Sequence, residues 1–275
     1  MDPGSLIVAL VAMLAAGLVA GFAAGLFGIG GGFVVVPALF AVLPLLGASA
    51  EELAHVAIGT SLATIVVTSL RSVQAHARRD AVDFAVLRGW APWIVGGVGA
   101  GVWLAARVPG HGLALIFGGG MLLMALHFLF PLLLSRRQVA EAMPRGAARA
   151  GIAGGIGAFS SLLGIGGGTI AIVVMTLCGK SIHRAIATAS GVGFIIAVPG
   201  VIGFIVIGHG ATGLPWGSLG YVNVPAAVVI TSTSILSAPW GAAAAHRLPA
   251  AALGRLFGVY LLAIGGLMIR NGLGG

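Results

Sequence analysis

Long apolar segments dominate this chain and limit what it can fold into. Of its 275 residues, 59% are hydrophobic and only 7% are charged, whereas a soluble domain carries about 25% charged residues. Several segments reach the roughly 20 residues that a helix needs to span a bilayer, and their hydropathy is continuous, which argues against a β-barrel. The sequence therefore predicts an all-α polytopic membrane protein in a lipid bilayer. Its ten apolar segments cover residues 5–27, 33–46, 53–73, 84–106, 112–134, 150–163, 169–179, 184–208, 219–245 and 250–270.

One glycine-rich motif interrupts these segments twice. Residues 26–32 read LFGIGGG, and residues 162–168 read LLGIGGG. Each glycine destabilises a helix by roughly 1 kcal/mol relative to alanine, so both stretches are expected to open the backbone. Open backbone at membrane depth is tolerated only where it is buried in protein or lines a cavity. The two glycine loops are therefore the predicted working site.

The two halves of the chain share further short matches in the same order. His55–Thr60 resembles His183–Thr188, and the Arg-Val-Pro run at 107–109 resembles Arg-Leu-Pro at 247–249. This order indicates an internal repeat of five apolar segments. The predicted division is an N-terminal transmembrane repeat at 1–134, a basic cytoplasmic linker at 135–149 and a C-terminal transmembrane repeat at 150–275.

Basic residues predict the orientation of the repeats. Loop 74–83 holds Arg78 and Arg79, the linker 135–149 holds four arginines, and both are expected in the cytoplasm. Counting membrane crossings from these two cytoplasmic segments puts Arg107 outside and Arg247 inside. Because these two arginines occupy matching positions of the repeats, the repeats have opposite orientation. An inverted repeat is typical of transporters, with the site near the midplane where the halves meet. The short segments 33–46 and 169–179 either bend back at the glycine loops as helical hairpins or cross obliquely.

The residues at the loops suggest an anion site. A helix that starts just after each loop directs its free N–H groups and its dipole at the loop, and both favour anions. The third glycine of a dinucleotide fingerprint would fall at Phe33 or Thr169, and no phosphate-binding P-loop is present. Hydroxyls at matching positions of segments three and eight add polar groups. The candidate substrate-binding residues are Gly28, Gly30, Gly31, Gly32, Gly164, Gly166, Gly167, Gly168, Thr169, Thr60, Ser61, Thr188 and Ser190.

Ionisable groups are scarce inside the predicted spans. His127 lies in the middle of the fifth segment and is the candidate for a proton-linked step, the alternative being a neutral histidine bonded to a neighbouring helix. All six carboxylates fall in loops or termini, so no carboxylate relay for protons or sodium is expected. Export of an anion needs none, because each exported charge gains about 2.3 kcal/mol per 100 mV of membrane potential. With one cysteine and no ligand cluster, no disulfide, metal or cofactor is expected.

The first loop, Gly28-Ile29-Gly30-Gly31-Gly32, follows a long first segment and precedes Val36-Pro37. With the second copy at Gly164, it resembles the TauE/SafE family of sulfite exporters over roughly residues 5–270. This resemblance implies transport of a small sulfur oxyanion or organosulfonate, such as sulfite or sulfoacetate, usually outward across the bacterial inner membrane. The second copy has Thr169-Ile170-Ala171 where the first has Phe33-Val34-Val35 and lacks a match to Pro37, so the two half-sites are not equivalent.

The favoured interpretation is a multi-pass secondary transporter that exports a small anion by alternating access, with no nucleic-acid partner. An anion channel built from the same parts is the nearest alternative, and saturable flux with countertransport would separate the two. A non-transporting membrane scaffold, which would bind no small anion, is a further alternative. An intramembrane enzyme is disfavoured, since the sequence contains no His-Glu-x-x-His motif, aspartate pair or Ser–Lys dyad. Whether the chain forms a homo-oligomer is left open.

Overall fold

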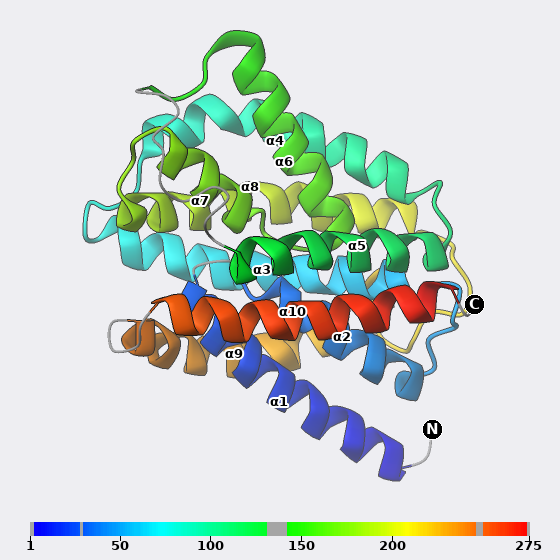
Figure 1. The fold of residues 1–275 in the computed structure, drawn as a ribbon. Coiled ribbons are helices and arrows are strands. Elements are labelled where there is room, and N and C mark those ends of the chain that lie inside the picture. Colours follow the sequence, from blue (N-terminus) through cyan, green and yellow to red (C-terminus); the bar gives the residue numbers. More distant parts are fainter. Residues whose placement is uncertain (1–2, 28–29, 131–141, 246–249, 274–275) are drawn as a thin grey trace.

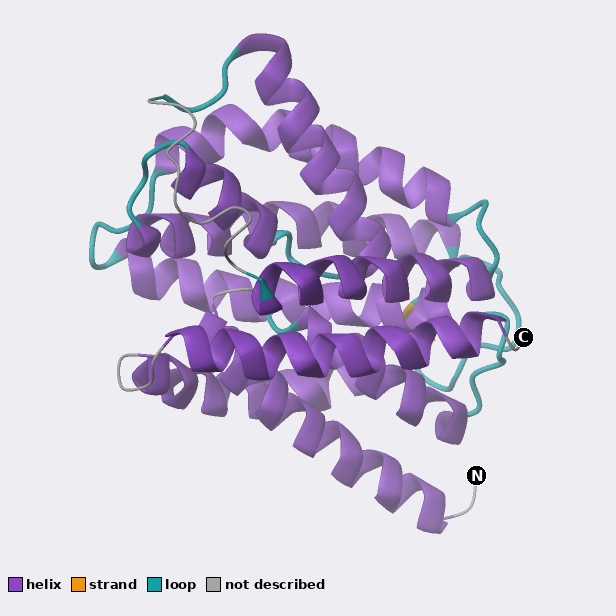
Figure 2. Ribbon diagram, viewed as in Figure 1, coloured by secondary structure: helices purple, strands orange, loops and turns teal. Residues whose placement is uncertain are grey.

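Helices form nearly all of the structure, a computed structural model that describes residues 3–27, 30–130, 142–245 and 250–273 (Figures 1 and 2). The first half contains α1 (Pro3–Phe27), α2 (Gly32–Val42), the single 3-10 turn η1 (Leu43–Leu46), α3 (Leu53–Ala77), α4 (Phe84–Ala105) and α5 (Gly110–Leu129). The second half contains α6 (Gly146–Leu163), α7 (Gly168–Leu177), α8 (Ile182–Ile207), β1 (Ser218–Leu219), β2 (Val222–Asn223), α9 (Val224–Ala245) and α10 (Ala250–Leu273).

Each of the ten predicted apolar segments corresponds to one α-helix, with shifts at the ends. The ninth segment was expected from residue 219, but α9 begins at Val224 because Ser218 and Leu219 pair in antiparallel register with Asn223 and Val222. This small hairpin is the departure from the all-α prediction. The helix α6 starts at Gly146, ahead of the expected residue 150. Residues 135–141 of the predicted linker lie outside the described residues, as do Arg247 and Gly28.

Length and composition identify helices that could cross a membrane. Within the described residues five qualify, Gly4–Leu26, Leu53–Ala77, Gly110–Leu129, Ile182–Ile207 and Val224–Gly241. The helices Gly32–Leu46 and Gly168–Leu177 are apolar but shorter, as the sequence predicts for the segments that follow the glycine loops. The most hydrophobic window of α3 is 67% buried, more than that of the other four, so α3 forms the centre of the bundle.

The helices pack in matching pairs. The central helices α3 and α8 contact each other, α2 packs on α3, and α7 packs on α8. In the outer layer α1 packs on α9, α6 packs on α4, and α5 packs on α10. Figure 1 shows α5 and α10 side by side with opposite chain directions, and likewise α1 and α6 run in opposite directions across the view.

Small residues allow the outer pairs to approach closely. A side chain at Gly17 or Gly21 of α1 would collide with the backbone carbonyls of Ile230 and Ser234 in α9. The Ser234 hydroxyl instead donates a hydrogen bond to the Gly17 carbonyl over 2.8 Å. In lipid the hydrophobic effect does not drive helices together, so helices associate through close backbone packing and interhelical hydrogen bonds of this kind.

Candidate functional site

Both glycine loops end in the same backbone conformation. In the first loop Gly30 and Gly31 have φ of 79° and 75°, and α2 begins at the next residue. In the second loop Gly164 and Gly167 have φ of 62° and 64°, and α7 begins at Gly168. Positive φ is open to glycine without steric cost, so the loops need glycine at these places. In both loops a left-handed glycine directly precedes a short helix.

The two loops touch each other. A Cβ atom on Gly32 would lie 2.6 Å from the Gly164 carbonyl oxygen and 3.1 Å from the Ile165 Cα. The Ser61 hydroxyl of α3 donates a hydrogen bond of 2.8 Å to the same Gly164 carbonyl. The predicted site residues Gly32, Gly164 and Ser61 therefore lie together, and we call this place the glycine crossing.

A third polar group reaches the crossing from α3. The Ser69 hydroxyl lies 2.8 Å from the Cβ position of Gly193 in α8 and 3.9 Å from the Cβ position of Gly30. The Gly166 carbonyl lies 3.3 Å from the same Gly193 position. Buried Ser69 thus lies between the first loop and the part of α8 that borders the second loop.

Two buried hydroxyls at the second loop have no hydrogen-bond partner in the described chain. They are the Oγ of Ser160, whose side chain is 0% exposed, and the Oγ1 of Thr169, which is 6% exposed. Ser160 Oγ lies 2.7 Å from the Cβ position of Gly167, and Thr169 is the second residue of α7. A buried hydroxyl without a partner costs about 1–3 kcal/mol.

The same end of α7 has free backbone donors. The first N–H groups of a helix have no acceptor within the helix, and the helix dipole makes that end partly positive. Here those groups lie beside the hydroxyls of Ser160 and Thr169. Together they form a set of unused donors that an oxyanion would satisfy without any charged side chain.

Thr169 was predicted from the sequence, whereas Ser160 was not. The signal was its position four residues before Gly164, one helical turn away on the face that leads into the loop. Ser69 stands out in the sequence as a polar residue of the third apolar segment but was not placed in the site, because a serine inside an apolar helix is usually bonded to its own backbone.

The predicted residues Thr60 and Thr188 have partners in the other half of the chain. Thr60 Oγ1 accepts a hydrogen bond of 2.8 Å from the Asn223 N–H, and Thr188 Oγ1 accepts one of 2.9 Å from the Asp83 N–H. Asn223 and Asp83 in turn cap α9 and α4, since their side chains accept from the N–H groups of Ala226 and Val86. Each threonine therefore holds the start of a helix in the other half of the chain.

The remaining predicted residues lie apart from these contacts. Ser190 donates to the Ala187 carbonyl of its own helix over 2.7 Å. His127 was expected in the middle of a span, but α5 ends at Leu129, so His127 lies in the last helical turn. Its ring packs edge-on against Phe128 with centroids 5.5 Å apart. Gly28 lies outside the described residues.

Known proteins resemble the chain along most of its length. The profile of the family described as sulfite exporter TauE/SafE matches residues 13–268. A probable membrane transporter protein of Haemophilus influenzae is 34% identical over 251 residues, which is 91% of this chain and 94% of that protein. The probable membrane transporter protein YunE of Bacillus subtilis is 28% identical over 72% of this chain and 79% of its own length. A probable membrane transporter protein of Methanocaldococcus jannaschii is 25% identical over 83% and 84%. No solved structure matches the chain.

Proposed function

Because the chain belongs to the sulfite exporter TauE/SafE family, we propose that it is a secondary transporter that exports a small sulfur-containing anion across the bacterial inner membrane. The family and its relatives are described as membrane transporters rather than enzymes. Sulfite and small sulfonates such as sulfoacetate are the proposed substrates. The family description, which names a sulfite exporter, supports sulfite and the outward direction.

The unpartnered hydroxyls at the second glycine loop carry the proposal. Ser160 and Thr169 are buried donors without acceptors, and they lie at the N-terminal end of α7. Sulfite and sulfonate oxygens are acceptors, so an anion placed there would take hydrogen bonds from both hydroxyls and from the first N–H groups of α7. The first loop has Phe33 at the position of Thr169, so the proposed site is asymmetric and belongs mainly to the second half.

Matching contacts support an inverted repeat and alternating access. The pair α1 and α9 corresponds to α6 and α4, and the pair α2 and α3 corresponds to α7 and α8. Thr60 with Asn223 likewise corresponds to Thr188 with Asp83. Two equivalent arrangements of this kind allow one half to rock against the other around a central site.

The contact at the crossing favours a transporter over a permanently open channel. Gly32 and Gly164 leave no space between their backbones, so an anion passes only after the two loops separate. Every carboxylate that the structure describes, namely Glu51, Glu52, Asp80 and Asp83, lies between helices. The membrane potential is therefore the proposed driving force, at about 2.3 kcal/mol per charge and 100 mV.

Flux measurements in proteoliposomes test this function. Vesicles containing the purified protein are loaded with sulfite or sulfoacetate, and a potassium diffusion potential, negative inside, is imposed with valinomycin. We expect saturable efflux that rises with the potential and is exchanged against external substrate. Linear, non-saturable flux would favour the channel, and absence of flux for both anions from correctly inserted protein would refute the proposed substrate class.

A further inference from the structure

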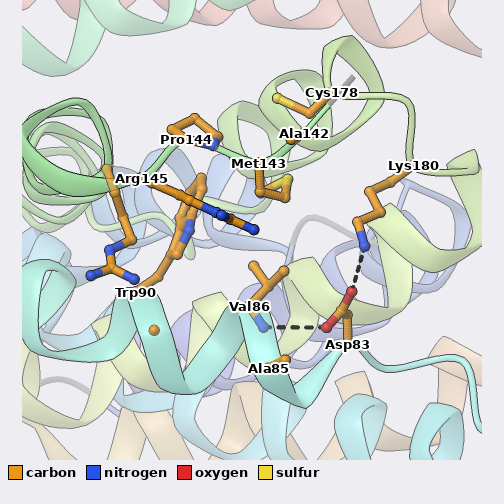
Figure 3. Close-up of a pocket in the computed structure, with 12 residues that line it drawn as sticks. Asp83, Ala85, Val86, Trp90, Ala142, Met143, Pro144, Arg145, Cys178 and Lys180 are labelled. Carbon is orange, nitrogen blue, oxygen red and sulfur yellow. Dashed lines mark hydrogen bonds and ion pairs between the residues drawn. The ribbon is translucent and has the colours of Figure 1, made fainter. Parts of the chain in front are cut away.

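A polar cavity, distinct from the glycine crossing, opens at the far end of α7. It has a volume of about 380 Å³ and is lined by the start of α4, the residues that lead into α6 and the residues that follow α7 (Figure 3). The helix α7 joins the second glycine loop to the cavity, with Gly168 directly after the loop and Cys178 just after the last helical turn in the cavity wall. Ten residues at about 1.5 Å each put the cavity roughly 15 Å from this loop.

Positive charge exceeds negative charge in the cavity wall. Arg145, Arg149 and Lys180 line it, and Asp83 is the acidic lining residue. Lys180 Nζ lies 2.8 Å from Asp83 Oδ2, and Figure 3 shows Lys180 and the Val86 main chain both bonded to that carboxylate. The Lys180 hydrogen bond holds the pKa of Asp83 below its usual range, so the carboxylate is ionised and paired at neutral pH. The positive charges of Arg145 and Arg149 therefore remain in the cavity wall without an acidic lining residue to balance them.

Arg149 is positioned to use its charge inside the cavity. Its Nε is buried and has no hydrogen-bond partner in the described chain. Its Nη1 lies 3.3 Å from the Cβ position of Gly89, so the guanidinium lies over the first turns of α4. The cavity also adjoins the N-terminal ends of α4 and α6, which add partial positive charge. A guanidinium presents paired donors that match the oxygens of a carboxylate or sulfonate.

The rest of the wall is apolar. Trp90, Met143, Val86 and Cys178 line the cavity beside the charged residues. A pocket of about 300–1,000 Å³ with a few placed polar groups suits an organic ligand, whereas a bare inorganic ion would leave this apolar surface wet. The mixture of cationic and apolar residues in the cavity wall thus indicates a ligand with an anionic head group attached to a short carbon chain.

We propose that this cavity is an entry site that binds a small organic anion, with its sulfonate or carboxylate head on Arg149 and its carbon chain against Trp90 and Met143. The inference rests on the proposed function and narrows it to organic sulfonates over inorganic sulfite. The surrounding end of the bundle, with Arg78, Arg79 and Arg184, is the basic end and hence the cytoplasmic end by the positive-inside rule. An exported substrate would reach this cavity before the crossing.

Calorimetric titration of the purified protein, in detergent without anionic lipid, tests the site. The probes are ethanesulfonate, sulfite and glycerol 3-phosphate, the last standing for a lipid head group. We expect ethanesulfonate to bind more tightly than the other two, and Arg149→Gln to weaken its binding at least 10-fold. Arg107→Gln serves as the matched control, because Arg107 is an exposed arginine that stacks on Trp103 at the other end of the bundle.

Three results would overturn the inference. They are unchanged ethanesulfonate binding in Arg149→Gln, tighter binding of sulfite than of ethanesulfonate, and tighter binding of glycerol 3-phosphate, which would assign the cavity to a lipid head group. Failure of the proposed function would look different. Wild-type vesicles would then show no flux, while ethanesulfonate binding would still depend on Arg149.

Discussion

Replacing Thr169 with valine should raise the stability of the empty protein and weaken anion binding at the same time. Valine keeps the branched shape of threonine and replaces the hydroxyl, which is buried and has no partner, with a methyl group. An unsatisfied buried hydroxyl costs about 1–3 kcal/mol, so its removal should stabilise the empty protein by about 1 kcal/mol. Most substitutions at a purely structural position would instead destabilise it.

The bound state should change in the opposite sense. A hydrogen bond to a charged group contributes about 1.5–3 kcal/mol, and about 1.4 kcal/mol corresponds to a tenfold change in affinity. Thr169→Val should therefore weaken anion binding by roughly 10- to 100-fold. In transport assays, the half-saturation concentration should rise by a similar factor.

The assay compares thermal melting of purified protein without substrate and concentration-dependent efflux from vesicles. Thr176→Val is the matched control on the same helix, because the Thr176 hydroxyl donates to the Ile172 and Val173 carbonyls over 2.9 Å. The control should leave the half-saturation concentration unchanged and should not raise the melting temperature. A lowered melting temperature together with wild-type transport in Thr169→Val would show that this hydroxyl has no role in binding.

Three further predictions concern the loops, the orientation and pH. Gly167→Ala should lower the melting temperature, because φ is 64° and the new Cβ would press on side chains of α6 and α8. The control Gly155→Ala should not lower it, because its Cβ meets open space. Equal melting temperatures of the two variants would contradict the loop geometry. In a cysteine-free background, a membrane-impermeant thiol reagent should label Arg107→Cys from outside the cell and His183→Cys only after permeabilisation. Labelling of both variants from the same side would exclude the inverted repeat. Because folding lowers the pKa of Asp83, the ionised carboxylate stabilises the folded protein at neutral pH, and this stabilisation is lost as the pH falls below about 4. The melting temperatures of wild type and Asp83→Asn should therefore differ at pH 7 and converge below about pH 4. A difference in melting temperature that stays constant with pH would show that the charge of Asp83 does not contribute to stability.

Features that depend on chain neighbours were predictable from the sequence. The apolar segments located the ten α-helices that the structure describes, because a continuous run of apolar residues favours a helix in a membrane. The glycine motifs located both backbone openings, because the cost of glycine in a helix is local. Short helices after each loop followed from the same pattern.

The tertiary structure decided which groups lack partners and which have them. Thr60 bonds to Asn223, which is 163 residues away in the chain, so its partner was not visible in the pattern of its own segment. Ser160 became a candidate only because packing left its hydroxyl buried and unbonded beside Gly167. The cationic cavity likewise brings together Arg149, Asp83 and Lys180 from three separate parts of the chain. Hydrogen bonds, burial and charge pairing act between groups that are close in space, and in a helical bundle the nearest groups come from distant segments.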